Sequence, residues 1–486
     1  MDAPQPGSRR TKILATIGPA CADPGVLRRL VAAGMDGARI NLSHGNAEQW
    51  LAQAREIRAI EEECGHPITV LCDLQGPKIR LAPDTPMRRV GLDDEVLVVS
   101  GMSTPEGTLA VAWDDVVEAA LPGVSELVIG DGTPRLDIIG ETVHGGVPAL
   151  VARCTKPGDV APRRGATITH VSHSAPSLTS KDRADLDVLR ELRPDVVALS
   201  FVRAAGDIDA LRGELAGRDL AEVRIVAKIE KSEAMRALDG IVAASDGIMV
   251  ARGDLGIELG VAELPLAQKR IIRRAAGAGK MVITATQMLE SMHLRPEPTR
   301  AEAPDVANAI IDGTSAVMLS GETAQGSYPV EAVSAMDEIA RVAERAITPS
   351  SPPDDILSDA EAVLKAAALL GESREVACYI TPTQTGGSPR ALARNRPRAP
   401  IVALCHDGNT ARQLALEWGV VARGFPEHRS VPAMLEAAME YVTGLMGLPP
   451  GAAVVMAYGP AVATPGGTSF IVLRHVPLPQ EQPAEG

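Results

Sequence analysis

The sequence predicts an α/β protein with a (β/α)8 TIM barrel, an inserted small β-barrel lid domain and a C-terminal α/β domain. Eight short aliphatic runs end in polar residues, and one is Val196–Leu199, whose unbroken apolar character is typical of a parallel strand buried on both faces. Stretches with helical periodicity, such as 185–192 and 266–276, lie between the runs. The gap between Asp73 and Asp195 is far longer than the others, which indicates an insertion.

The predicted strands define the candidate site, because barrels of this type carry their chemistry at the C-terminal ends of the strands. The eight runs are 12–17, 38–42, 68–73, 195–200, 223–229, 247–251, 281–286 and 316–319. Their ends supply Arg39, Asn41, Ser43, Asp73, Ser200, Arg203, Lys228, Glu230, Arg252, Asp254, Thr286, Ser320 and Glu322. Any one of these could be an ordinary solvated loop residue, but the whole set indicates a reaction centre.

The remaining segments predict two further domains. Strand-like runs at 95–99, 126–129 and 149–152, separated by Pro-Gly turns, indicate a β domain at the catalytic rim, where it can act as a lid. A Pro-rich and Ser-rich linker at 348–355 precedes alternating helical and strand patterns. The predicted boundaries are 1–81 for the first part of the barrel, 82–168 for the lid, 169–346 for the second, catalytic part of the barrel, and 347–486 for the C-terminal domain.

Composition excludes several classes of function. A net charge of -14 over 486 residues argues against binding to a nucleic-acid backbone, and 2% aromatic residues argue against base stacking. The six cysteines include no C-x-x-C pair, so neither a disulfide framework nor a zinc site is indicated. Residues 1–7 show no apolar signal region, and no run is long enough to span a bilayer. We therefore expect a soluble cytoplasmic protein with no membrane or nucleic-acid partner.

Two motifs predict the chemistry. Alternation along the fifth strand places Lys228 and Glu230 on the same side, where they form either a simple salt bridge or part of a reaction centre. The segment 252–256, Arg-Gly-Asp-Leu-Gly, turns from the sixth strand into a helix start, whose free backbone N–H groups can bind an anion. Glu230 and Asp254 together form a plausible Mg²⁺ pair. The motifs indicate metal-dependent phosphoryl transfer.

At these motifs the chain resembles the pyruvate kinase family, from about Thr11 to the C-terminus. The matching segments are 11–13, 16–19, 38–45, 76–80, 228–230, 249–258, 285–292, 298–302 and 305–309. The resemblance implies transfer of a phosphoryl group from phosphoenolpyruvate to ADP, giving pyruvate and ATP in glycolysis. Two alternative functions are open at this point. The chain could be a non-catalytic or weakly active paralogue that senses metabolites, or another barrel enzyme that uses phosphoenolpyruvate or pyruvate.

The resemblance also implies roles for single residues. Glu230 and Asp254 would hold Mg²⁺, with Mn²⁺ as an alternative. Catalytic and substrate-binding roles would fall to Lys228, Arg39, Thr286 and the backbone of Gly253 and Asp254. The nucleotide side would be lined by Asn41, His44, Arg80 and Lys181. For Lys181 the alternative is an ordinary solvated lysine that follows a helix-capping Ser180.

Three further expectations follow from the resemblance. Many members bind K⁺ near positions that match Asn41, Ser43, Asp73 and the carbonyl of Leu74, but here Lys78 supplies a charge that can replace K⁺, so we expect no K⁺ requirement. The loop with Thr381, Thr383, Thr385, Gly386, Gly387 and Ser388 resembles one that binds an effector phosphate, from a sugar phosphate or a nucleotide. The lid departs from the family at 130–132 and 165–167. We expect a homotetramer.

Overall fold

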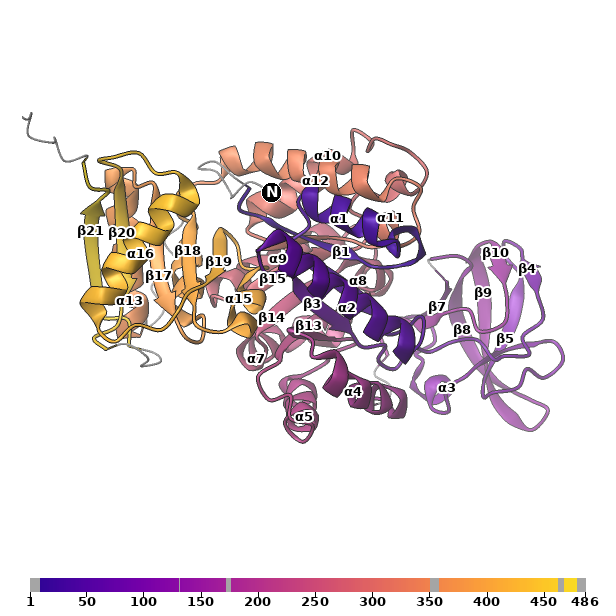
Figure 1. The fold of residues 1–486 in the computed structure, drawn as a ribbon. Helices are drawn as coiled ribbons and strands as arrows, with labels where there is room; N and C mark the ends of the chain where they lie inside the picture. The colour runs from indigo at the N-terminus through magenta and orange to yellow at the C-terminus, as the bar shows by residue number, and fades with distance from the viewer. Residues whose placement is uncertain (1–8, 131, 172–175, 350–357, 462–466, 479–486) are drawn as a thin grey trace, which may run out of the picture.

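The computed structural model describes residues 9–130, 132–171, 176–349, 358–461 and 467–478. It has three parts along one axis, with the barrel in the middle, the inserted β domain at one end and the C-terminal domain at the other (Figure 1). The predicted linker at 348–355 lies mostly outside the described residues, as does Asp131 of the lid. No helix among the described residues is long and apolar enough to cross a membrane.

Eight parallel strands close into the barrel, as predicted. They pair in the order β1-β16-β15-β14-β13-β12-β3-β2. Their bounds are β1 Lys12–Thr16, β2 Gly37–Asn41, β3 Thr69–Asp73, β12 Val196–Leu199, β13 Arg224–Ile229, β14 Gly247–Ala251, β15 Met281–Ala285 and β16 Ala316–Leu319. β15 ends one residue before its predicted end, because Thr286 has a φ of 68° and leaves the extended conformation.

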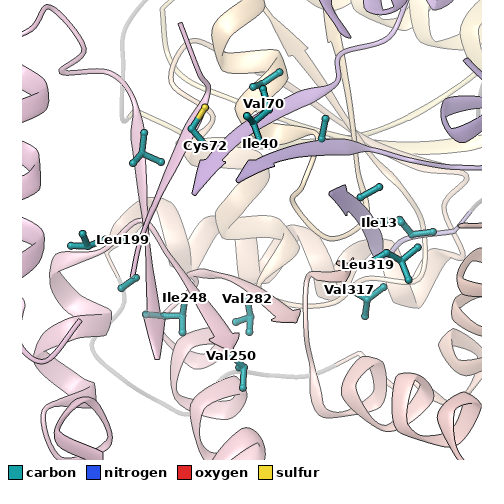
Figure 2. Packing of buried hydrophobic residues seen from close by; sticks show 14 of the residues in the cluster. Ile13, Ile40, Val70, Cys72, Leu199, Ile248, Val250, Val282, Val317 and Leu319 are labelled. Carbon is teal, nitrogen blue, oxygen red and sulfur yellow. The ribbon is translucent and has the colours of Figure 1, made fainter. Parts of the chain in front are cut away.

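Helices surround the strands and bury the outer face of the barrel. They are α1 Pro24–Ala32, α2 Ala47–Cys64, α4 Ser180–Leu192, α5 Ala205–Ala216, α6 Ser232–Arg236, α7 Leu238–Ala244, α8 Arg252–Leu259, α9 Leu264–Gly277, α10 Glu302–Asp312, α11 Gly321–Ala324 and α12 Pro329–Ala343, with 3-10 turns η1 Pro19–Cys21, η2 Glu290–His293 and η3 Glu344–Ala346. Aliphatic side chains such as Val70, Ile248 and Val282 point from the strands into this layer (Figure 2). Their burial is the main stabilising contribution to the barrel.

The inserted β domain is a curled six-stranded sheet with the order β11-β7-β8-β9-β5-β6 beside a two-stranded ribbon. Its elements are β4 Arg88–Val90, β5 Glu95–Ser100, β6 Thr108–Val111, α3 Val116–Ala119, β7 Glu126–Ile129, β8 Arg135–His144, β9 Val147–Lys156, β10 Gly158–Val160 and β11 Ala166–Ile168. The two chain segments that join it to the barrel pair with each other, since Leu81 N–H donates to the Arg164 carbonyl (2.8 Å) and Ala166 N–H to the Ile79 carbonyl (3.1 Å).

The C-terminal domain is a five-stranded sheet with the order β19-β18-β17-β20-β21, parallel except for β21. Its elements are α13 Asp359–Arg374, β17 Cys378–Thr383, α14 Gly387–Ala393, β18 Ile401–Cys405, α15 Gly408–Leu414, β19 Val420–Gly424, α16 Val431–Met446, β20 Ala453–Tyr458 and β21 Phe470–His475. Alternation along β17 sends Tyr379 to the core beside α13 to α15 and Ile380 to the core beside α16.

One side chain of the C-terminal domain belongs to the interior of the barrel. Leu416 is fully buried among residues that fill the barrel, including Leu14, Leu71 and Met281. It closes the N-terminal end of the strands, opposite the polar strand ends. Around it, the Lys12 ammonium donates to the Val420 carbonyl (2.8 Å), and Arg412 Nε donates to Asp195 (2.8 Å).

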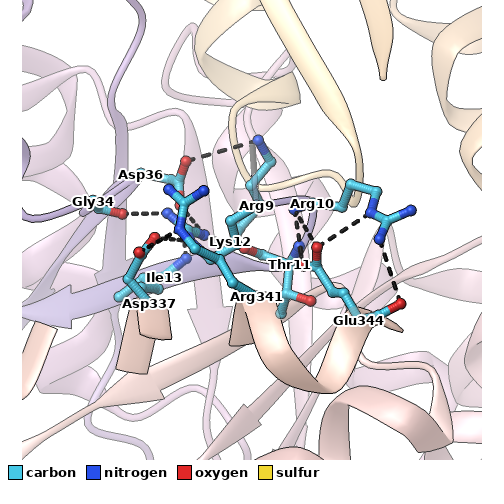
Figure 3. A network of polar contacts seen from close by, with 10 residues as sticks. All are labelled: Arg9, Arg10, Thr11, Lys12, Ile13, Gly34, Asp36, Asp337, Arg341 and Glu344. Carbon is cyan, nitrogen blue, oxygen red and sulfur yellow. Dashed lines mark hydrogen bonds and ion pairs between the residues drawn. The ribbon is translucent and has the colours of Figure 1, made fainter. Parts of the chain in front are cut away.

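A network of charges fixes the chain segment before β1 to the barrel (Figure 3). Arg9 is paired with both Asp36 and Asp337 at 2.8 Å. Glu344 accepts hydrogen bonds from the Arg10 and Thr11 backbone N–H groups (2.8 and 2.6 Å). The segment is therefore fixed to the end of α12 and to η3.

The three tryptophans lie in three different parts of the fold. Trp50 is on α2 beside the barrel strands, and the Lys181 ammonium lies 5.5 Å from its ring. Trp113 packs against the core of the inserted β domain. Trp418 is buried at the junction of the barrel and the C-terminal domain, between the guanidinium groups of Arg10 (5.5 Å) and Arg396 (4.8 Å).

Candidate active site

Lys228 is at the centre of the polar strand ends. Its ammonium lies 3.0 Å from Glu230 and 3.2 Å from Asp73, and it donates a hydrogen bond to the Ser200 hydroxyl at 2.7 Å. These groups come from β13, β3 and the end of β12. Glu230 is on the same side of the chain as Lys228, as strand alternation predicts. The structure therefore places three predicted strand ends in one buried cluster.

Arg39 contacts the same cluster from β2. Its Nε and Nη2 atoms bind one oxygen of Asp73 at 2.8 and 2.7 Å, and its Nη1 donates to the Thr16 hydroxyl at 3.1 Å. Asp73 thus lies between two cations and is almost completely buried. This carboxylate aligns Arg39 and Lys228 side by side at the barrel mouth.

The protonation states follow from this packing. Burial opposes the charge on Asp73, but Lys228 and Arg39 together lower the pKa of its carboxyl below the usual value. Burial also opposes the charge on Lys228, but Asp73 and Glu230 raise the pKa of its ammonium. Both groups are therefore ionised at neutral pH, and the lysine presents a permanent positive charge.

Glu230 behaves differently. Burial raises the pKa of its carboxyl, and the nearby Asp254 carboxylate adds to this, although Lys228 opposes the shift. The Phe201 backbone N–H donates to one Glu230 oxygen at 2.6 Å. The repulsion between Glu230 and Asp254 is the kind that a bound divalent cation removes.

The carboxylate pair fits a hard divalent ion. Asp254 is half-buried in the first turn of α8 and faces the same region as Glu230. Among the described residues no cluster has three or more His, Cys, Asp or Glu side chains in metal-binding positions. A two-carboxylate set suits Mg²⁺, which keeps several positions for water and substrate oxygens.

Thr286 and the start of α8 are directly connected. The Gly253 backbone N–H donates to the Thr286 hydroxyl oxygen at 2.8 Å, and that hydroxyl donates to the Ala285 carbonyl at 2.6 Å. The helix start supplies backbone N–H groups that favour an anion such as a carboxylate.

The predicted nucleotide residues lie on the β2 side of the mouth. The Lys181 ammonium donates to the Leu42 carbonyl at 2.8 Å and pairs with Asp185 at 2.6 Å, so it binds the loop that leads from Asn41, the last residue of β2, to His44. The expected capping role of Ser180 is wrong, because Thr179 caps α4 in a box with Asp182. Sequence favours Ser180 there because serine caps helices as readily as threonine.

Arg80 and His44 complete this side. Arg80 Nη1 donates to the Arg163 carbonyl at 3.1 Å, which directs it toward the base of the inserted β domain. Burial lowers the pKa of the His44 imidazole, and the charges of Lys78, Arg39 and Arg80 lower it further. His44 is therefore neutral near pH 7 within a positively charged rim, which suits phosphate oxygens.

The residues predicted to surround a monovalent cation lie at the adjacent ends of β2 and β3, where Asn41 is in register with Asp73. The Leu74 carbonyl accepts a hydrogen bond from the Ser200 hydroxyl at 2.7 Å, and the Asn41 side-chain oxygen accepts one from Ser43 N–H at 3.1 Å. Lys78 is exposed, and its Cε would lie 3.7 Å from a Cβ on Gly165. Within the described part of the chain, no hydrogen bond or ion pair holds its ammonium.

The predicted effector loop borders a cavity of about 340 Å³ in the C-terminal domain, remote from the barrel mouth. Thr383, Thr385, Gly387 and Ser388 line it, whereas Thr381 is buried against β18 and donates to the Val402 carbonyl at 3.4 Å. No lysine or arginine is among the described residues that line the cavity.

Two residues of the site had no assigned role in the sequence motifs. Ser200 connects Lys228 to the Leu74 carbonyl, and Arg252 holds the backbone of the Thr286 turn. Both occur among the polar residues at the predicted strand ends, and this position was the feature of the sequence that pointed to a role in the site. Their partners are carbonyl groups from other strands, and sequence does not show such partners.

This barrel brings together two cations, a carboxylate pair suited to a divalent ion and an anion-binding helix start. Such a site is that of a metal-dependent phosphoryl-transfer enzyme, in which positioning and charge neutralisation do most of the work.

Comparison with known proteins agrees with a metal-dependent phosphoryl-transfer enzyme and identifies the family. The family model "Pyruvate kinase, barrel domain" matches residues 8–333, and "Pyruvate kinase, alpha/beta domain" matches 361–473. The chain is 37% identical over 475 residues to the pyruvate kinase of Geobacillus stearothermophilus, covering 95% of this chain and 80% of that protein. It is 38% identical to that of Methylorubrum extorquens, covering 96% and 98%. This chain belongs to the pyruvate kinase family.

Family membership settles the reaction. The chain has the activity of a pyruvate kinase, a phosphotransferase that uses phosphoenolpyruvate and ADP with a divalent metal.

Proposed function

We propose that Lys228, Arg39, Glu230, Asp254 and Thr286 carry the reaction. The observation that supports this is the Lys228 ammonium, held at 3.0 and 3.2 Å by Glu230 and Asp73 with Arg39 on the same Asp73. In this proposal Arg39 and Lys228 contact the phosphoryl oxygens and neutralise their charge during transfer. Glu230 and Asp254 would hold Mg²⁺, which would supply charge neutralisation for the substrate oxygens.

The second half of the reaction is proposed to take place at Thr286. Loss of the phosphoryl group leaves enolpyruvate, which becomes pyruvate when its terminal carbon gains a proton. The backbone N–H groups of Gly253 and Asp254 bind the substrate carboxylate at the start of α8. The Thr286 hydroxyl, 2.8 Å from Gly253 N, then lies next to the reacting carbon and orients the proton donor.

The nucleotide is proposed to bind between the barrel mouth and the inserted β domain. Asn41, His44, Arg80 and Lys181 line this region, and the paired tethers at 79–81 and 164–166 allow the β domain to close as a lid. Closure excludes water from the transferring phosphoryl group. The domain division 1–81, 82–168, 169–346 and 347–486 is part of this proposal.

We further propose that the enzyme needs no K⁺, because the Lys78 ammonium adds positive charge to the rim formed by Arg39, Arg80 and His44. In a coupled assay of pyruvate formation with Mg²⁺, ADP and phosphoenolpyruvate, we expect the same turnover with and without K⁺. Replacing Lys78 by Met should lower the K⁺-free rate by about tenfold, since loss of one favourable charge costs roughly 1.4 kcal/mol of transition-state stabilisation, and K⁺ should restore part of it.

The assay has a matched control in Lys156→Met, which removes an exposed lysine from β9 of the inserted β domain. A wild-type enzyme that works only with K⁺ would refute K⁺ independence. Absence of any turnover would instead favour the metabolite-sensor alternative, and pyruvate formation without ADP would favour a different barrel enzyme.

Two regulatory proposals rest on the family resemblance. The enzyme is a homotetramer, which sedimentation or light scattering tests. The loop with Thr383, Gly387 and Ser388 binds the phosphate of a sugar phosphate or nucleotide. Because lysine and arginine are absent among the described lining residues, we expect sugar monophosphates and AMP to activate more strongly than a sugar bisphosphate. Gly387→Trp should abolish activation, and an unregulated wild-type enzyme would contradict the proposal.

A further inference from the structure

The turn after β15 has an unusual backbone. Thr286 and Gln287 have φ values of 68° and 53°, so two consecutive residues with side chains adopt the left-handed region. Thr286 is β-branched, and such residues rarely accept a positive φ. A conformation of this kind persists only where surrounding contacts enforce it, and it is common at active sites.

Arg252 supplies those contacts. Its Nε and Nη2 atoms donate to the Thr286 carbonyl at 3.1 and 2.8 Å, and Nη2 also donates to the Gln287 carbonyl at 2.9 Å. The opposite edge of the guanidinium donates to Asp305 at 2.7 Å. The side chain is only 7% exposed. A planar group with five donors thus fixes both carbonyls of the strained turn.

The residue after Arg252 holds the other end of Thr286, because Gly253 N–H donates to its hydroxyl oxygen at 2.8 Å. That hydroxyl also donates to the Ala285 carbonyl, so its orientation is fully determined. Side chain and backbone at 252–253 together lock Thr286 to the first turn of α8. The groups proposed to bind the substrate carboxylate and to orient the proton donor therefore form one rigid unit.

We propose that Arg252 is a positioning residue for protonation of enolpyruvate, acting through Thr286. The inference rests on the proposed role of Thr286. Arg252 itself does not face the Lys228 and Arg39 cluster, since its hydrogen-bond partners among the described residues are the turn carbonyls, Gln268 and Asp305. A lysine cannot replace it, because a single ammonium cannot donate in one plane to two carbonyls and a carboxylate.

The test measures protonation separately from phosphoryl transfer. By microscopic reversibility, an enzyme that protonates enolpyruvate also exchanges the methyl protons of pyruvate. A C–H bond breaks, its electrons form the enolate double bond, the proton leaves to solvent, and a deuteron from D₂O takes its place. NMR follows this exchange on the full-length enzyme with Mg²⁺ and pyruvate.

We expect Arg252→Lys to slow exchange by about tenfold or more, while the KM for phosphoenolpyruvate changes little. Arg274→Lys is the matched control, because Arg274 is exposed and pairs with Asp239 at the surface, and it should exchange like wild type. Wild-type exchange in Arg252→Lys would overturn the inference. An equal loss of exchange and phosphoenolpyruvate affinity would also overturn it, as a general structural role predicts that pattern.

A double-mutant cycle with Thr286→Val distinguishes an effect that acts through Thr286 from a general loss of stability in Arg252→Lys. If Arg252 acts through Thr286, its substitution adds little further loss of turnover in the Thr286→Val background. Additive losses would overturn the inference. If Thr286→Val exchanges like wild type, the proposed role of Thr286 fails, and that result differs from failure of the Arg252 inference alone.

Discussion

Lys228→Met is expected to lower kcat for pyruvate formation by about 10³- to 10⁵-fold, the range that a transition-state cation contributes in phosphoryl transfer. The lysine is 12% exposed and held between Asp73 and Glu230, so its charge acts where water screens it poorly. Its removal leaves the buried carboxylates Asp73 and Glu230 without the ammonium between them. The coupled assay of pyruvate formation measures the loss.

Two further variants sharpen this test. Lys228→Arg should recover little activity, because the larger planar guanidinium cannot occupy the position 2.7 Å from the Ser200 hydroxyl and 3.0 Å from Glu230. Lys269→Met removes a partly exposed lysine that pairs with Asp312 on α10, and it should retain wild-type turnover. A Lys228→Met enzyme with turnover within tenfold of wild type would exclude Lys228 as the phosphoryl-stabilising group.

Leu416→Ala is expected to reduce the free energy of unfolding by about 2–5 kcal/mol, as other buried leucine truncations do. Leu416 is fully buried, and its Cδ2 would lie 2.9 Å from a Cβ on Gly37 of the barrel. The substitution opens a cavity between the C-terminal domain and the N-terminal ends of the strands. Urea denaturation followed by circular dichroism measures the change.

The matched control is Leu369→Ala on α13, where the side chain is 60% exposed, and it should change stability by less than about 0.5 kcal/mol. If Leu416→Ala were as mild as Leu369→Ala, Leu416 would not contribute to the barrel core. Separate unfolding transitions for the two domains in the wild type would likewise contradict the common core.

The architecture of the barrel could be predicted because its signal is local. Runs such as Val196–Leu199 are apolar on both faces. This pattern can be recognised without knowing which segments pack beside the strand. The polar ends of the same runs gave the cluster of Asp73, Lys228 and Glu230, since strand ends of a barrel meet at one mouth.

Other features depend on contacts between distant segments and were not predictable. β19 is only five residues long and begins shortly after α15. From sequence alone, its short apolar run resembles a continuation of that helix. Nothing in the local sequence distinguishes Leu416 from other leucines. Its side chain nevertheless packs in the barrel interior, against residues that are far away in the sequence. The support of Thr286 by Arg252 depends on carbonyl groups, which every residue has.

The distribution of the tryptophans gives the enzyme an optical reporter in each of its parts. Trp50 lies beside Lys181 at the proposed nucleotide side, Trp113 in the inserted β domain, and Trp418 between Arg10 and Arg396 at the junction with the C-terminal domain. With only three such residues, double Trp→Phe variants leave one emitter at a time. Emission spectra and quenching by iodide or acrylamide can then follow nucleotide binding, lid closure and domain separation independently, without an added dye.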